Sequence, residues 1–163
     1  MVHLNPSPAS FEVNGDAPRA ALRILYADDL RELREVTRLS LTRDGHQIEC
    51  YPDAPSALVR LMEDPAFDLV ITDHHMPGMS GLEFVRQLRR LQFKGKIMVF
   101  SSELSSNVAA DYQNLGVDRI IYKPVFPSAL RQVMAELFGL PMPANRGTVS
   151  PFSRNPWGKA SNP

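Results

Sequence analysis

Segments with the pattern of a β-strand alternate five times with segments that have the pattern of an α-helix between residues 21 and 139. The expected strands are short, largely apolar runs at residues 22–27, 47–51, 67–72, 96–100 and 119–122. Strands that alternate with helices over short connections form right-handed crossovers, which build a parallel sheet covered by helices on both faces. We therefore expect one α/β domain with three layers.

The helical segments differ in how clearly they present an apolar face. In the second helix we expect Leu58, Leu61 and Met62 to point inward and Asp53 to cap the N-terminus. The fourth helix, from about 107 to 115, has a weak apolar stripe, which is typical of a mobile element. The last helix has the clearest stripe, with apolar residues at positions i, i+3, i+4, i+7 and i+8: Leu130, Val133, Met134, Leu137 and Phe138.

The composition limits the classes of partner and compartment. Basic and acidic residues number 18 each, so the formal net charge of zero gives no reason to expect binding to nucleic acid or to an anionic membrane. Cys50 is the single cysteine, which excludes an internal disulfide and favours a cytoplasmic location. The first twenty residues do not have the pattern of a secretory signal, and no apolar run approaches the length of a membrane helix.

Two terminal segments differ in composition from the central region. Residues 1–20 and 140–163 contain several prolines, and the second segment has no acidic residue. Segments of this kind bury too little apolar surface to offset the entropy of the chain. We expect a disordered N-terminal extension over 1–20, a folded domain over 21–139 and a flexible tail over 140–163.

Polar side chains follow four of the five expected strands. The carboxyl ends of parallel strands meet at one edge of a sheet, where ligands bind in open α/β folds. A single aspartate at the end of a strand is most often a helix cap or a turn former. The prediction of a functional site therefore depends on all of these polar residues together. The residues at these strand ends are Asp28 and Asp29, Asp73, Ser101 and Ser102, and Lys123.

Three carboxylates that converge within a few ångströms repel one another unless a cation neutralises them. Mg²⁺ suits this set, because it takes one or two carboxylate ligands, retains several waters and accepts phosphate oxygens. The sequence therefore predicts a magnesium site formed by Asp28, Asp29 and Asp73.

Four sequence blocks together resemble the receiver domain of bacterial two-component response regulators, a family that includes the single-domain chemotaxis regulators. The blocks are I-L-Y-A-D-D, D-L-V-I-T-D-H-H-M-P-G-M-S-G-L-E, M-V-F-S-S-E and Y-K-P, and they occur in the order typical of the family. The resemblance covers roughly residues 21–139. It implies a flavodoxin-like (βα)5 fold, a three-layer sandwich whose five-stranded parallel sheet has the order 2-1-3-4-5.

The resemblance also implies roles for individual residues. Asp73 matches the phosphoacceptor, which takes a phosphoryl group from a phosphohistidine, and Lys123 matches the lysine that pairs with the phosphoryl oxygens. Asp28 and Asp29 match the acidic pair that holds Mg²⁺. The backbone carbonyl of His75 is expected to complete the protein's metal ligands, and its side chain to tune attack of water on the phosphoaspartate.

Other residues match the switch of the family. Ser101 corresponds to the hydroxyl that hydrogen-bonds the attached phosphoryl group, and we place Glu103, in the same block, with the switch residues. Many members carry an aromatic switch residue where this chain has Ile120, and its own aromatic, Tyr122, stands two places later. The peptide bond before Pro124 matches a cis bond of the family, which only X-Pro bonds form at modest cost.

The residues alone support phosphoryl transfer, which requires in-line positioning and positive charge around the phosphoryl oxygens. A carboxylate is a suitable nucleophile that is already ionised at neutral pH.

A haloacid-dehalogenase-like phosphatase is an alternative function, but it needs a second aspartate where this chain has His75. A second alternative is a pseudo-receiver, a binding module that is never phosphorylated. A metal site at His74 and His75 is disfavoured, because adjacent residues point apart.

We expect a stand-alone response regulator and not an enzyme acting on other molecules. Its expected partners are a sensor histidine kinase or histidine phosphotransfer protein and a downstream effector protein. The fourth helix, fifth strand and last helix are the surface through which a homodimer is expected to form. Binding to nucleic acid or membrane is not expected.

Overall fold

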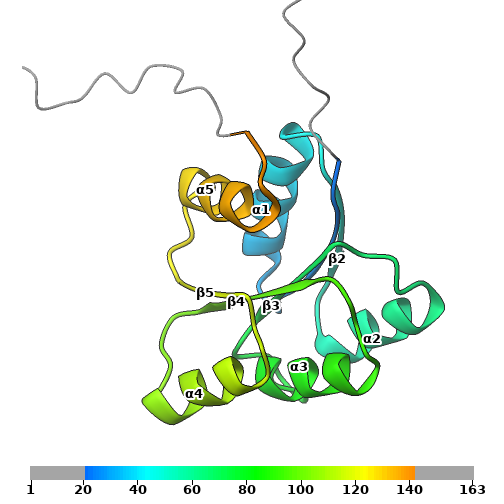
Figure 1. The fold of residues 1–163 in the computed structure, drawn as a ribbon, viewed down its shortest axis with the longest axis vertical. Coiled ribbons are helices and arrows are strands. Elements are labelled where there is room, and N and C mark those ends of the chain that lie inside the picture. The colour runs from blue at the N-terminus through cyan, green and yellow to red at the C-terminus, as the bar shows by residue number, and fades with distance from the viewer. Residues whose placement is uncertain (1–20, 142–163) are drawn as a thin grey trace, which may run out of the picture.

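The computed structural model describes residues 21–141, which form a five-stranded parallel sheet with five helices (Figure 1). The strand order β2-β1-β3-β4-β5 confirms the prediction. The strands are β1 (Arg23–Ala27), β2 (Gln47–Tyr51), β3 (Leu69–Asp73), β4 (Lys96–Ser101) and β5 (Arg119–Tyr122). The helices are α1 (Arg31–Arg43), α2 (Ala54–Glu63), α3 (Gly81–Arg90), α4 (Ser106–Asn114) and α5 (Pro127–Phe138). The predicted N-terminal extension and residues 142–163 of the predicted tail lie outside the described residues.

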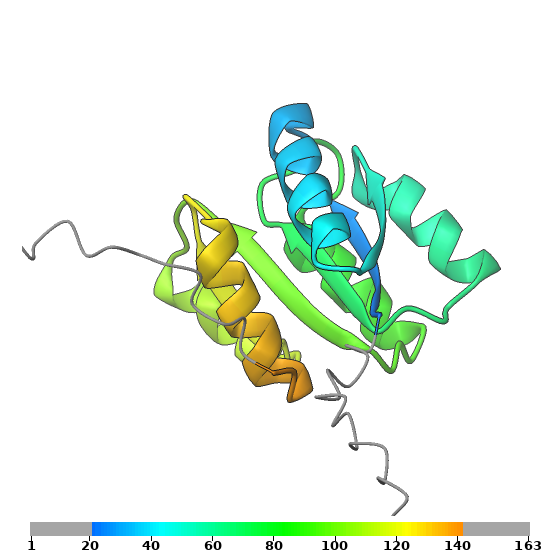
Figure 2. The ribbon, with the colours of Figure 1, turned by 90° about the horizontal axis from the view of Figure 1, so that it is seen from above.

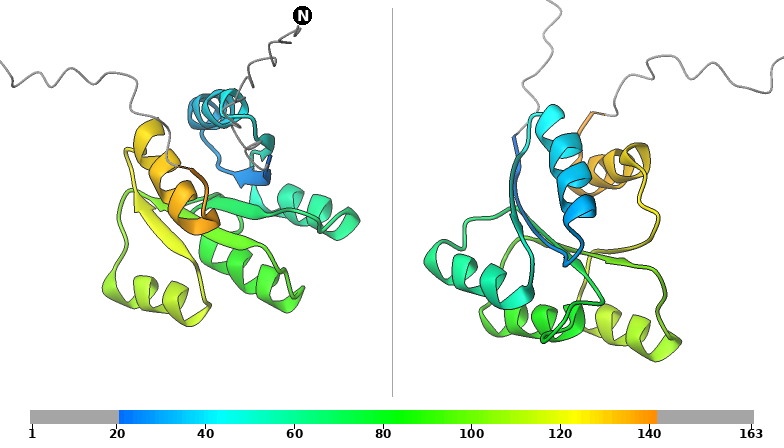
Figure 3. Two further views of the ribbon diagram at one scale, coloured as in Figure 1. Left: turned by 45° about the horizontal axis from the view of Figure 1, so that its top comes forward. Right: turned by 180° about the vertical axis from the view of Figure 1, so that it is seen from behind.

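Helices cover both faces of the sheet, as alternating strands and helices require. α1 and α5 lie over one face, and α2, α3 and α4 lie over the other (Figures 1 and 3). Seen from above, α1 and α5 stand in front of the strands (Figure 2). Side chains alternate between two apolar cores, so Leu25 and Val70 pack toward α2 and α3 whereas Ile24 and Ile71 pack toward α1 and α5.

Local sequence determines where several helices begin. Asp53 caps α2, because its side chain accepts a hydrogen bond from the Ser56 amide at 2.8 Å. Ser80 and Glu83 form a capping box at the start of α3, in which each side chain accepts from the other residue's backbone N–H. The predicted cap at Asp53 is thereby confirmed.

The prediction for Met62 is wrong, since 70% of this residue is exposed. Leu61 is buried as expected, and Leu58 is partly buried against the core. Val36 and Leu39 on α1 are also more than half exposed. The reason is that α1 and α2 lie near the β2 edge of the sheet (Figure 1), so neighbouring elements bury only two residues of α1 and three of α2.

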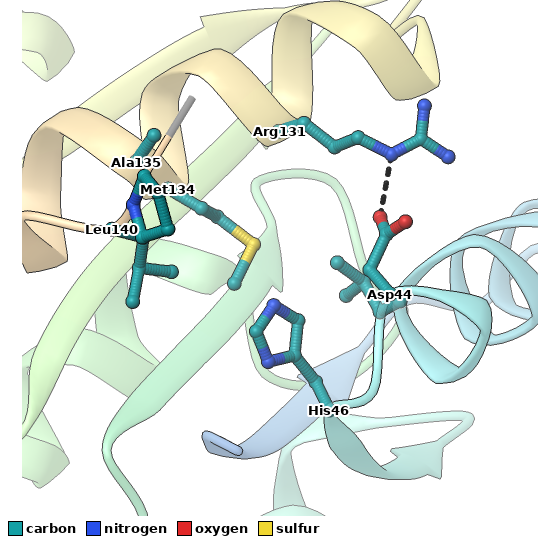
Figure 4. Close-up of a pocket in the computed structure, with 8 residues that line it drawn as sticks. Asp44, His46, Arg131, Met134, Ala135 and Leu140 are labelled. Atoms are coloured by element: carbon teal, nitrogen blue, oxygen red, sulfur yellow. Dashed lines mark hydrogen bonds and ion pairs between the residues drawn. The ribbon is translucent and has the colours of Figure 1, made fainter. Parts of the chain in front are cut away.

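A small apolar pocket lies at the amino ends of the strands, where the end of α1 meets α5 (Figure 4). The guanidinium of Arg131 donates to Asp44 at 2.6 Å and joins the two helices. Nδ1 of the buried His46 accepts a hydrogen bond from the Leu22 amide at 3.3 Å. These contacts lie at the end of the sheet opposite Asp73. Within residues 21–141, no helix is long and apolar enough to cross a membrane.

Candidate functional site

The predicted carboxylates converge at the carboxyl ends of β1 and β3. These strands are neighbours in the sheet, so their last residues lie side by side. One carboxylate oxygen from each of Asp28, Asp29 and Asp73 lies within 4.8 Å of the other two. Asp28 is fully buried and Asp73 is 4% exposed, whereas Asp29 is exposed to solvent. A set of oxygen donors with one open side fits a hard divalent cation such as Mg²⁺.

Lys123 contacts two of these carboxylates from the end of β5. Its ammonium lies 2.9 Å from Asp73 Oδ1 and 3.1 Å from Asp28 Oδ2. The backbone fixes its position, because the Lys123 amide donates to the carbonyl of Ser101 at 2.8 Å. The peptide bond between Lys123 and Pro124 is cis, as predicted. The structure therefore brings together the acidic and basic residues that the sequence placed at separate strand ends.

Burial and neighbouring charges have opposite effects on the pKa values of Asp73 and Lys123. Burial raises the pKa of Asp73, although the hydrogen bond and charge of Lys123 oppose the shift. Burial lowers the pKa of Lys123, but the hydrogen bonds and charges of Asp73 and Asp28 outweigh burial and raise it overall. Lys123 is therefore an ammonium ion at neutral pH. One partly buried cation facing two buried carboxylates leaves an excess of negative charge, which favours a bound metal ion.

Tyr26 supports Asp28 from within the core. Its hydroxyl donates to Asp28 Oδ2 at 2.7 Å, and the Leu30 amide donates to Oδ1 at 2.8 Å. Tyr26 is fully buried, and burial together with the charge of Asp28 raises its pKa, so the hydroxyl stays a donor. Tyr26 was not among the predicted site residues. Residues two apart on a strand share a face, so the spacing of Tyr26 and Asp28 contained the signal.

The predicted switch residues lie on β4 and β5 or in the loop that follows β4. Ser101 is buried and its hydroxyl donates to the carbonyl of Glu103 at 2.8 Å, so it points into the loop that leads to α4. Ile120 packs against the core beneath α2, α3 and α4. Tyr122 is 56% exposed.

The two histidines after Asp73 have different surroundings. His75 is exposed, whereas His74 is partly buried and its Nδ1 lies 2.7 Å from the hydroxyl of Tyr112 on α4. Burial and the neighbouring His75 lower the pKa of His74. Among residues 21–141, the cluster with metal-ligand geometry is that of Asp28, Asp29 and Asp73, and it includes no histidine. No residue pattern in the sequence indicated the contact between His74 and Tyr112.

Comparison with known proteins agrees with the fold. The family model described as "Response regulator receiver domain" matches residues 24–135. The chain is 34% identical over 129 residues to the sensor histidine kinase AruS of Pseudomonas aeruginosa, a match that covers 77% of this chain and 13% of the kinase. It is 34% identical over 119 residues to the response regulator MprA of Mycolicibacterium vanbaalenii, covering 73% of this chain and 50% of that protein.

The chain therefore spans half or less of the length of these two relatives. A solved structure, the chemotaxis protein CheY4 of Vibrio cholerae, superimposes with a TM-score of 0.67 and 26% sequence identity. That match covers 72% of this chain and 98% of CheY4. Phosphorylation on an aspartate and binding of Mg²⁺ at an acidic pocket are general features of receiver domains. The match of the family model over most of the described residues, together with the strand order 2-1-3-4-5, establishes that this chain belongs to the response regulator receiver domains of two-component systems.

Proposed function

We propose that Asp73 accepts a phosphoryl group from a phosphohistidine on a sensor histidine kinase or a histidine phosphotransfer protein. The observation that carries this proposal is the position of the Asp73 carboxylate at the end of β3. It lies 2.9 Å from the ammonium of Lys123 and within 4.8 Å of oxygens of Asp28 and Asp29. A nucleophile, a fixed cation and a set of metal ligands are the parts that phosphoryl transfer requires.

In the transfer, an oxygen of the Asp73 carboxylate attacks phosphorus in line with the nitrogen of the phosphohistidine. The phosphorus–nitrogen bond breaks, its electron pair remains on the imidazole, and the imidazole takes up a proton from solvent. The Lys123 ammonium pairs with a phosphoryl oxygen and holds it against Asp73. Asp28, Asp29 and the backbone carbonyl of His75 are proposed to hold Mg²⁺, which supplies further positive charge to the phosphoryl oxygens.

The attached phosphoryl group adds negative charge and acceptor oxygens next to Ser101. We propose that the Ser101 hydroxyl leaves the carbonyl of Glu103 and donates to a phosphoryl oxygen. This rotation changes the loop before α4, so the surface formed by α4, β5 and α5 differs between the two states. That surface is the proposed contact for a downstream effector protein or for a second copy of the chain.

The test is incubation of the full chain with Mg²⁺ and acetyl phosphate, followed by intact mass measurement. The wild type is expected to gain one phosphoryl group, and Asp73→Asn none. Asp111→Asn, which removes an exposed carboxylate on α4, is the matched control and is expected to gain the group. Failure of the wild type to gain it would favour a partner-binding module that is never phosphorylated. A gain by Asp73→Asn equal to that of the wild type would remove the assignment of the phosphoacceptor.

His75 is proposed to influence how long the phosphorylated form lasts. Its side chain is exposed two residues after Asp73, and we propose that it lies beside the path of a water molecule that attacks the phosphoaspartate. Replacing His75 by alanine is expected to change the decay rate of the phosphorylated protein several-fold. An unaltered decay rate would rule this role out.

A further inference from the structure

Tyr112 and His74 form a hydrogen bond between α4 and the segment that carries the phosphoacceptor. Nδ1 of His74 lies 2.7 Å from the Tyr112 hydroxyl, within the range of a strong hydrogen bond. The two rings also meet edge to face, with centroids 5.7 Å apart. His74 follows Asp73 directly in the chain, so one residue joins the proposed phosphorylation site to a helix on the face of the sheet formed by α2, α3 and α4.

Tyr112 is the main anchor of α4. Its side chain is packed in the core with 0% of the residue exposed to solvent, and it is the buried residue of this helix. Val108 of α4 packs against the same core but is only partly buried. An ion pair of Asp111 with Arg86 at 3.4 Å, in which both side chains are about half exposed, also joins α4 to α3. An exposed ion pair contributes little to the free energy of folding. The position of α4 therefore depends strongly on the surroundings of Tyr112.

His74 cannot move independently of the phosphoacceptor segment. Its amide donates to the carbonyl of Phe100 and its carbonyl accepts from the amide of Gly81, each at 2.9 Å. Space around the pair is also limited, since a Cβ atom on Gly81 would lie 3.0 Å from the Tyr112 hydroxyl and 2.2 Å from the carbonyl oxygen of Asp73. The hydroxyl of Tyr112 is thus held against a rigid backbone next to Asp73.

The loop between β4 and α4 is a second connection between the proposed phosphorylation site and α4. The Ser101 hydroxyl is bonded to the carbonyl of Glu103, and Ser105 caps the first turn of α4 by accepting from the Val108 amide. The proposed rotation of Ser101 toward Asp73 would break its bond to Glu103 and displace the start of α4. Hydrogen bonds act over a short range, so a displacement of about 1 Å at Tyr112 is enough to break its bond to His74.

We propose that the His74–Tyr112 pair holds α4 in its unphosphorylated position and that the pair breaks when Asp73 is phosphorylated. This inference rests on the proposed function. It makes His74 and Tyr112 positioning residues that set how far α4 responds to the phosphoryl group. β5 has Ile120 at the position where many members of the family carry an aromatic switch residue, and in this chain the buried Tyr112 of α4 contacts the residue after Asp73.

The test compares hydrogen exchange of residues 106–114 in the full chain before and after phosphorylation by acetyl phosphate and Mg²⁺. Intact mass measurement follows phosphoryl occupancy in the same samples. Tyr112→Phe removes only the hydroxyl and keeps the ring in the core. Without phosphorylation, this variant is expected to exchange about two- to tenfold faster over α4 than the wild type, the range set by the loss of one hydrogen bond. In the phosphorylated form it is expected to match the wild type.

His74→Leu is expected to behave as Tyr112→Phe does, and the double variant to show no further change, because either substitution removes the same bond. His74→Asn keeps a polar group near the position of Nδ1 and is expected to lie closer to the wild type. Tyr51→Phe is the matched control, since it removes a hydroxyl that donates to Glu49 far from α4. It is expected to leave exchange over α4 unchanged.

Two outcomes would overturn this inference while leaving the proposed function intact. If Tyr112→Phe accelerates exchange equally in both states, the pair is only a packing contact. If exchange over α4 in this variant equals that of the wild type in both states, the bond does not hold the helix. Failure of the wild type to take up a phosphoryl group would instead overturn the proposed function, and this inference with it.

Discussion

Lys123 Nζ lies 2.9 Å from Asp73 Oδ1, although the strands that carry the two residues are not neighbours. β4 lies between β3 and β5, so the lysine side chain reaches across the end of one strand. The same ammonium contacts Asp28 at the end of β1, which is a further strand away. The partly buried ammonium of Lys123 thereby neutralises part of the negative charge that β1 and β3 deliver to one edge of the sheet.

Replacing Lys123 by methionine is expected to lower the free energy of unfolding by about 2–4 kcal/mol at pH 8 without metal, because it leaves two buried carboxylates without their cation. The loss is expected to be smaller at pH 5. Unpaired buried carboxylates have pKa values above the unfolded ones, so their cost is absent when they are protonated and grows as pH rises. Urea denaturation at the two pH values measures both effects.

Lys96→Met is the control for this prediction. Lys96 also contacts a carboxylate, Asp118, at 2.9 Å, but 44% of its side chain is exposed. Its replacement is expected to cost less than about 1 kcal/mol and to show little dependence on pH. Equal losses for the two variants would contradict the view that Lys123 neutralises buried charge.

Mg²⁺ is expected to stabilise the folded protein, because the cluster of Asp28, Asp29 and Asp73 exists only in the folded state. At 100 times the dissociation constant, the gain in free energy of unfolding is about 2.7 kcal/mol, and a chelator should abolish it. Asp29→Asn removes the exposed ligand without disturbing the buried ion pairs and should strongly reduce the gain. Thermal unfolding with and without Mg²⁺ measures the stabilisation. If Mg²⁺ stabilises Asp29→Asn as much as the wild type, Asp29 is not a metal ligand.

Tyr26→Phe is expected to destabilise the protein by about 1.5–3 kcal/mol, the range for losing a hydrogen bond to a charged group. Asp28 also loses one of the donors that orient it, so Mg²⁺ is expected to bind up to about tenfold more weakly. Calorimetric titration with Mg²⁺ gives the affinity independently of phosphorylation. If Tyr26→Phe binds Mg²⁺ as the wild type does, the hydroxyl stabilises the core without orienting a metal ligand.

Cys50 is expected to react slowly with iodoacetamide in the native protein. Burial raises the pKa of its thiol to about 11, even though Arg38 and Arg34 oppose the shift. Only the thiolate is nucleophilic, and at pH 8 a group with this pKa is ionised in about one molecule in a thousand. The alkylation rate should rise about tenfold per pH unit between pH 8 and 10. A rate equal to that of the urea-unfolded chain would show that the thiol is not shielded.

The sequence determined the architecture, because the alternation of short apolar runs with helical stripes leaves few ways to cover a sheet. It also determined which chemical groups meet at the site. Asp28, Asp29, Asp73 and Lys123 each follow a strand, and parallel strands end at one edge. The pairing of Tyr26 with Asp28 could have been predicted from the sequence, since Asp28 directly follows β1 and stands two residues after Tyr26, a spacing that places side chains on one face of an extended chain.

Only the tertiary structure decided how far each helix is covered and which distant side chains touch. Met62 and Leu39 belong to apolar stripes but are exposed, because α2 and α1 lie near the sheet edge, and periodicity does not record how much of a helix face a neighbour covers. The bond between His74 and Tyr112 joins residues far apart in the chain. Its formation depends on the separation of α4 from β3 and on the absence of a side chain at Gly81. Such distances follow from the packing of whole elements, which local residue patterns do not specify.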